Sequence, residues 1–100
     1  MTEGSDTYEV CTFIVVCDFP KQLANDRSSA KLEQILINCA TYVLNSVLRY
    51  NIVKAYEKIS VSNNPSDPGA VFTWKVSLVD ASKVEKLTKQ FWQEAVTEFS

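Results

Sequence analysis

Three cysteines and the lack of histidine limit the chemistry open to this sequence. The cysteines are Cys11, Cys17 and Cys39. Without histidine, Ser–His and Cys–His nucleophile pairs are excluded, as is the commonest metal ligand. Cys11 and Cys17 fall on one predicted strand, roughly 20 Å apart at about 3.3 Å per residue, whereas a disulfide needs Cα atoms within about 7 Å. We therefore interpret all three as reduced, buried thiols and expect neither a metal ion nor a cofactor.

Asp18, Asp67 and Asp80 are the candidate carboxylates for acid–base chemistry. Each falls at a predicted strand end or turn, where aspartate is also favoured for structural reasons. Asp18 and Asp80 flank predicted helix starts, a position that suits metals or phosphates. With only Gly4 and Gly69 in the chain, no glycine-rich loop can cradle a phosphate. We expect a protein that is not an enzyme; carboxylates that converge in the fold are the remaining catalytic alternative.

Basic side chains offer nucleic-acid binding as an alternative function. One tyrosine and three lysines would share the solvent-facing side of the predicted sheet: Lys54, Tyr56, Lys58 and Lys75. The net charge of −2 opposes phosphate contacts. An RNA-binding sheet would also need Phe72 and Trp74 exposed for base stacking. That orientation would turn polar residues such as Thr73 into the core, so we expect both aromatic rings to be buried.

The elements that must position these residues follow the order β-α-β-β-α. Strands are predicted over 8–19, 52–62 and 70–79, helices over 29–50 and 83–98, and at most one helical turn within 20–27. Residues 1–7 are expected to form a flexible tail, and residues 8–100 a single α+β domain. A β-α-β crossover followed by a hairpin predicts a three-stranded antiparallel sheet in the order 1-3-2, with both helices on one face. This architecture resembles a ferredoxin-like sandwich without its fourth strand.

Both predicted helices carry apolar residues three and four positions apart, as core-facing helices do. In the first helix these are Leu32, Ile35, Leu36, Cys39, Ala40, Val43 and Val47. In the second they are Val84, Leu87, Phe91, Ala95 and Phe99, bordered by Trp92 and Val96. Asp26 or Ser28 is the expected N-cap of the first helix, and Ser82 to Glu85 match a capping box for the second. In the third strand, the residues expected to face the helices are Phe72, Trp74, Val76 and Leu78.

The predicted first strand is apolar on both faces. In the order 1-3-2 it is also a sheet edge, and a long apolar edge without Pro or Lys invites pairing with another strand. We expect it to pair with its counterpart in a second copy, which gives a six-stranded sheet with two-fold symmetry. The residues at this interface would be Val10, Thr12, Ile14 and Val16. The alternative is that the N-terminal tail, or residues 19–26, folds back over the strand.

Two further surfaces show features of partner binding. The first helix carries a narrow polar stripe, most of which is uncharged: Gln34, Asn38, Thr41, Asn45 and Arg49. Interface cores are depleted in charge. A small polar window on a deeply packed helix is the alternative interpretation. The 63–69 loop contains Asn64 and Asp67; loops often carry function, but a slack turn with a mobile tip is the alternative.

These features favour a non-catalytic protein–protein interaction module, homodimeric through its first strand. Small acidic domains without catalytic groups include adaptors, assembly factors and phage-encoded inhibitors of host defence systems such as anti-CRISPR proteins.

The polar N-terminus is unlike a signal peptide, and the longest apolar stretch is shorter than the about 20 residues that span a bilayer. We expect a cytoplasmic protein with a protein partner and no membrane contact. Single-stranded nucleic-acid or nucleotide binding is the alternative.

Overall fold

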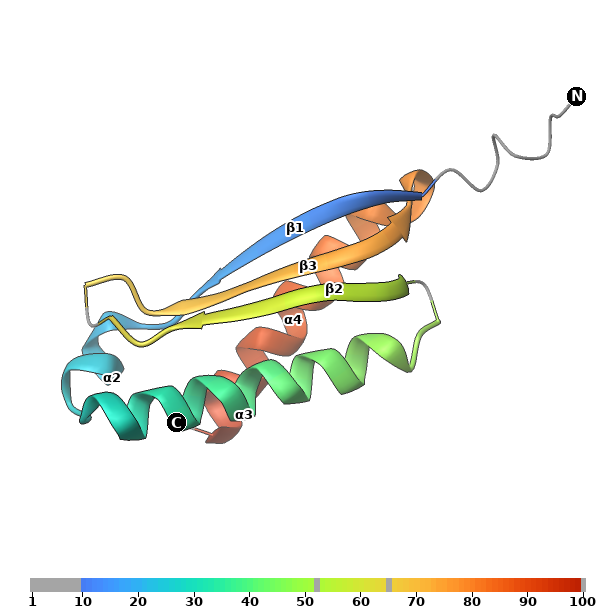
Figure 1. Cartoon of the computed structure of the whole chain (residues 1–100). Helices are drawn as coiled ribbons and strands as arrows, with labels where there is room; N and C mark the ends of the chain where they lie inside the picture. The colour runs from blue at the N-terminus through green and yellow to red at the C-terminus, as the bar shows by residue number, and fades with distance from the viewer. Residues whose placement is uncertain (1–9, 52, 65, 100) are drawn as a thin grey trace, which may run out of the picture.

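The computed structural model describes residues 10–51, 53–64 and 66–99, with the backbone alone over 53–58. Its elements are β1 (Val10–Asp18), α2 (Lys21–Asn25), α3 (Ser29–Leu48), β2 (Val53–Ser62), β3 (Gly69–Ser77), the 3₁₀ turn η1 (Leu78–Asp80) and α4 (Ala81–Phe99). The three strands form one antiparallel sheet in the order β1-β3-β2. The long helices α3 and α4 lie on the same face of it (Figure 1). The predicted fold class is confirmed, whereas the predicted 1–7 tail lies outside the described residues.

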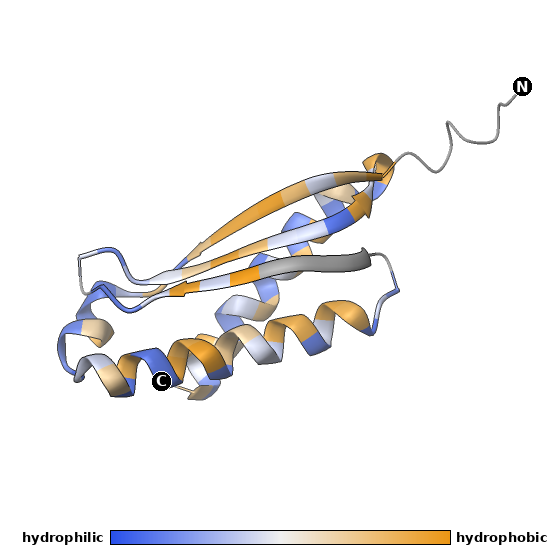
Figure 2. Ribbon diagram, viewed as in Figure 1, coloured by the Kyte–Doolittle hydropathy of each residue, from blue (hydrophilic) through white to orange (hydrophobic). Residues whose placement is uncertain are grey.

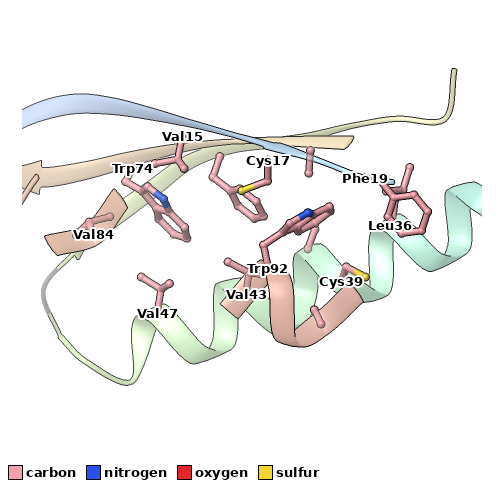
Figure 3. Packing of buried hydrophobic residues seen from close by; sticks show 14 of the residues in the cluster. Val15, Cys17, Phe19, Leu36, Cys39, Val43, Val47, Trp74, Val84 and Trp92 are labelled. Carbon is pink, nitrogen blue, oxygen red and sulfur yellow. The ribbon is translucent and has the colours of Figure 1, made fainter. Parts of the chain in front are cut away.

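The core fills the space between the sheet and these two helices (Figure 3). Val15 and Cys17 of β1 are buried there together with Phe72, Trp74 and Val76 of β3, as the two-residue alternation of strands predicts. The rings of Phe72 and Trp74 stack with centroids 5.7 Å apart. The buried residues of α3 are those of the predicted stripe except Ile35, which is half-buried: Leu32, Leu36, Cys39, Ala40, Val43 and Val47.

Helix α3 begins at a side-chain cap. The Ser28 Oγ accepts a hydrogen bond from the Lys31 backbone N–H at 3.3 Å, which satisfies one of the free amides of the first turn. Ser28 is therefore the N-cap, and Asp26 instead ends α2. After α3, Asn51 adopts a positive φ of 56°, a conformation that asparagine tolerates better than most residues.

Helix α4 differs from its prediction at its start. Strand β3 ends at Ser77, and Leu78 opens η1 instead of facing the helices. Leu78 and Val79 are 60% and 82% exposed. The 3₁₀ turn leads directly into α4 at Ala81, so Ser82 lies inside the first turn and the predicted capping box does not begin the helix.

The buried face of α4 is also rotated from the predicted one. Thr88 and Trp92 lie at its centre beside Val84 and Ala95, whereas the predicted Leu87 and Phe91 are half-buried and Phe99 is exposed. The Thr88 hydroxyl donates to the Val84 carbonyl at 2.7 Å. A buried polar group is tolerated when it is hydrogen-bonded. Thr88 can therefore occupy a core position, although its polarity predicts an exposed one.

Candidate functional site: the free edge of β1

The free edge of β1 and the solvent-facing side of that strand are apolar. Along its whole length β1 pairs with β3, and no other described strand lies beside it. Val10, Ile14 and Val16 point away from the helices and are 44%, 59% and 56% exposed; Thr12 is exposed on the same face. The strand is hydrophobic over most of its length (Figure 2). The structure thus places all four predicted interface residues on one accessible surface.

The backbone of β1 shows which groups face the free edge. The Phe19 N–H donates to the Pro68 carbonyl at 2.9 Å, and this pair continues the β1–β3 register. In an antiparallel ladder, alternate residues direct their N–H and C=O groups to opposite sides of the strand. Odd-numbered residues of β1 therefore bond toward β3, and even-numbered residues direct their backbone groups outward. The outward set is Val10, Thr12, Ile14, Val16 and Asp18.

Trp92 forms a hydrogen bond with the backbone at one end of this edge. Its indole Nε1–H donates to the Asp18 carbonyl at 3.0 Å, while its ring packs edge-on against Phe72 at 6.0 Å. The last outward carbonyl of β1 is thus already bonded within the chain. The edge groups left without a described hydrogen bond are the N–H and C=O groups of Val10, Thr12, Ile14 and Val16, together with the N–H of Asp18.

Exposed apolar side chains continue past the other end of β1. Val10 is the register partner of Ser77, so η1 begins beside the start of β1. The exposed Leu78 and Val79 of η1 therefore lie at the same end of the sheet as Val10. Scattered exposed apolar residues are ordinary, but a contiguous group marks an interaction surface.

Residues 19–26 do not cover β1. Phe19 and Ala24 are buried in the core, and the segment continues into α2 instead of returning along the edge. This part of the fold-back alternative is wrong, because Phe19 and Ala24 anchor the segment in the core between the sheet and the helices. The N-terminal tail lies outside the described residues.

The polar stripe of α3 is exposed, as predicted. Gln34 Nε2 donates to Asn38 Oδ1 at 3.1 Å, and Asn45 lies farther along the exposed side of the helix. Asn38 and Asn45 line a shallow hollow with Thr41, Tyr42 and Phe99. The Tyr42 hydroxyl donates to Glu94 of α4 at 3.0 Å, and this hydrogen bond raises the pKa of Tyr42.

The predicted basic surface is only partly described. The side chains of Lys54, Tyr56 and Lys58 lie outside the described residues, and Lys75 is half-buried on β3. In the backbone register Tyr56 pairs with Trp74 and Lys58 with Thr73, with a register shift between the two pairs. Strict two-residue alternation therefore does not run unbroken through this stretch. Phe72 and Trp74 are buried as expected, so they form no exposed platform for stacking bases.

The 63–69 loop is held in place by hydrogen bonds. Asn64 accepts from the Ser66 N–H through its side chain at 3.0 Å and from the Asp67 N–H through its carbonyl at 2.9 Å. Asn63 Nδ2 donates to the Ser29 carbonyl at the start of α3, at 3.4 Å. The two asparagines thus bond within the loop and to α3. Asn64 and Asp67 remain exposed.

The candidate catalytic residues do not gather in one place. Asp18 and Asp67 line one shallow hollow at the loop end of the sheet, whereas Asp80 lies in η1 at the other end.

The three cysteines differ in burial. Burial raises the pKa of Cys17 to about 12 and that of Cys39 to about 11. Cys11 is half-buried, whereas the sequence predicted a buried thiol. Within the described part of the chain, no three His, Cys, Asp or Glu residues are grouped as metal ligands would be. None of the described helices combines the length and apolarity needed to cross a bilayer.

Comparison with known proteins adds no relative. No protein-family model matches the chain, and neither curated proteins nor solved structures show a significant match. The inferences below therefore rest on the geometry of the β1 edge and its surroundings.

Proposed function

We propose that this protein is a non-catalytic protein–protein interaction module that forms a homodimer through the β1 edge. The observation that carries the proposal is the edge itself: the alternate residues Val10, Thr12, Ile14 and Val16 present backbone groups that pair with no other described strand, and Val10, Ile14 and Val16 add exposed apolar side chains. An unprotected edge of this kind is a template for another strand. Strand addition satisfies the backbone groups and brings the apolar side chains of the two strands into contact, which removes part of their surface from water.

A second copy suits this edge because the segment carries no charge. From Val10 to Cys17 the sequence contains no Asp, Glu, Lys or Arg. Two copies of a chain with net charge −2 can therefore meet here without placing like charges opposite each other, which would destabilise a strand pair. A symmetric pairing would merge the two sheets into one of six strands and leave the edge protected.

The dimer would leave other surfaces free for a different protein. The exposed α3 stripe, which includes Gln34, Asn38 and Asn45, is mostly uncharged, as interface cores tend to be. The loop presents Asn64 and Asp67. We place partner binding on these surfaces and on the solvent-facing side of the sheet. An adaptor, an assembly factor or an inhibitor of a host defence system would act through such contacts.

Sedimentation of the full chain tests the homodimer. At micromolar concentration the wild-type protein should sediment at twice the 11.3 kDa of one chain. Val16→Lys should be monomeric, since Val16 is exposed on the edge strand and a lysine on an edge strand opposes pairing with another strand. Ser60→Lys is the matched control, because Ser60 is exposed on the far strand β2; it should remain dimeric. A wild-type monomer, or a Val16→Lys dimer of unchanged affinity, would contradict the proposal.

A further inference from the structure

We infer that pairing of two copies through the β1 edge also packs their α4 helices against each other, beneath the seam between the two sheets. This inference rests on the proposed homodimer and names a second surface that its interface would contain. The surface is the flank of α4 that carries Glu85, Lys89 and Gln93, called here the edge flank.

The edge flank lies under the free edge of β1. Helix α4 packs under β1, whereas α3 packs under β2. Lys89 and Gln93 line a shallow hollow together with Val16 and Asp18 of β1. Because Val16 and Asp18 direct their backbone groups outward, this hollow opens at the free edge. The hydrogen bond from Trp92 to the Asp18 carbonyl holds α4 close to the strand there.

The opposite flank of α4 is already packed against α3. The rings of Phe91 and Tyr42 meet edge-on with centroids 6.4 Å apart, and Glu94 accepts a hydrogen bond from the Tyr42 hydroxyl at 3.0 Å. On the edge flank, Lys89 Nζ lies 3.3 Å from Glu85 Oε2, and both side chains are about half exposed. The flank under the free edge is therefore the one that α3 leaves accessible.

The symmetry of the proposed dimer brings the two edge flanks together. A two-fold axis perpendicular to the sheet runs the two β1 strands antiparallel, as neighbouring strands of this sheet already run, and keeps the helices of both copies on one face. Paired strands lie about 4.8 Å apart, and packed helices have axes about 8–10 Å apart. Two helices that lie under adjoining strands therefore contact each other for any axis near the middle of β1.

The charges of the edge flank are compatible with a second copy of the same flank. Glu85 lies one turn before Lys89, so the flank carries both signs of charge. The two copies of α4 would run in opposite directions, and a surface of mixed sign would meet another of mixed sign instead of a like-charged one. A partner that contributed only a strand would leave the edge flank exposed. The contact thus distinguishes a second copy from a strand-only partner.

Charge reversal in the full chain tests this contact. Lys89→Glu leaves the edge flank acidic, and Glu85→Lys leaves it basic. Each variant alone should dimerise about tenfold more weakly than a control of equal net charge, because like charges then meet across the axis. An equimolar mixture of the two should dimerise at least as tightly as the wild type, since an acidic flank then faces a basic one. Sedimentation at graded protein concentrations measures these affinities, and the differences should vanish at about 1 M salt.

Lys83→Glu and Glu98→Lys are the matched controls. They make the same changes in net charge at exposed positions of the same helix. Lys83 lies two residues before Glu85, so the two side chains do not share a flank, and Glu98 lies on the α3 side, near Tyr42. Mixing these two controls should therefore give no gain in affinity beyond that expected from net charge.

The outcomes separate the α4 contact from the homodimer. If the edge-flank variants dimerise as tightly as their controls and their mixture gains nothing more, the α4 contact is wrong, while a dimeric wild type keeps the homodimer. A monomeric wild type would contradict the proposed function itself. Circular dichroism reports whether each variant folds. If Glu85→Lys does not, Gln93→Lys takes its place in the mixture, because Gln93 is exposed on the same flank.

Discussion

Trp92 has two roles that its hydrophobicity alone does not show. Its ring contributes to the core against Phe72, and its N–H ends the free edge of β1 at Asp18. Thr88, one turn earlier, is buried because its hydroxyl bonds within α4. At the scale of single residues, hydrogen bonds of polar atoms therefore decide both which face of α4 is buried and how much of β1 stays free.

The buried thiol of Cys17 should make stability depend on alkaline pH. Burial raises its pKa from an ordinary value of 9.0 to about 12 in the folded chain. Above pH 9 the unfolded chain loses this proton while the folded chain keeps it, so the stabilisation is complete below pH 9 and is lost as pH rises toward 12. The contribution to the free energy of unfolding should fall by about 1.4 kcal/mol per pH unit in that window.

Urea unfolding of wild type and Cys17→Ala between pH 8 and pH 11 measures this effect. The variant is less stable at pH 8 because it leaves a small cavity, but its stability should fall less steeply with pH. Parallel curves for the two proteins would show that Cys17 does not titrate as its burial implies.

At the scale of elements, β1 presents two different sides. Toward β3 its odd-numbered residues complete a ladder, whereas its even-numbered residues direct unused groups outward. Toward the helices it is buried, and toward solvent it is apolar. An element with these properties forms part of the fold on one edge and is available for pairing on the other.

A pair of proline substitutions separates these two edges. Ile14→Pro removes an N–H that faces the free edge, and proline is tolerated on edge strands, so we expect a folded monomer. Phe13→Pro removes an N–H that bonds to β3 opposite Trp74, and should destabilise the fold by about 3 kcal/mol or more. Circular dichroism and sedimentation report fold and mass separately. An Ile14→Pro protein that remains a dimer would show that β1 is not the dimer interface.

At the scale of the whole molecule, dimerisation through β1 would couple folding to concentration. Association stabilises the folded state by mass action, because the six-stranded sheet would exist only between folded chains. The Tm of the wild type should therefore rise with protein concentration. Each tenfold increase in concentration adds about 1.4 kcal/mol of stability per mole of dimer. Thermal melts of wild type and Val16→Lys across a hundredfold dilution series check this. A wild-type Tm that stays constant would argue for a monomer.

Local periodicity predicts much of this fold. The alternation of β3 places Phe72 and Trp74 in the core, and the three-and-four spacing of α3 identifies nearly all of its buried face. The apolar outer face of β1 is also visible in the chain, since exposed Ile14 and Val16 lie between core residues. These features are predictable because neighbouring residues alone set strand and helix geometry.

Only the tertiary structure decides the remaining features, because they depend on groups far apart in the chain. The bond from Trp92 to Asp18 spans 74 residues, and no local pattern indicates that Trp92 lies on the buried face of α4 and reaches β1. The bond from Asn63 to Ser29 likewise ties the loop to a helix 34 residues away. The sequence alone thus determined that β1 is an apolar edge. That the last carbonyl of β1 is already bonded was decided by a polar atom that reaches it from another element.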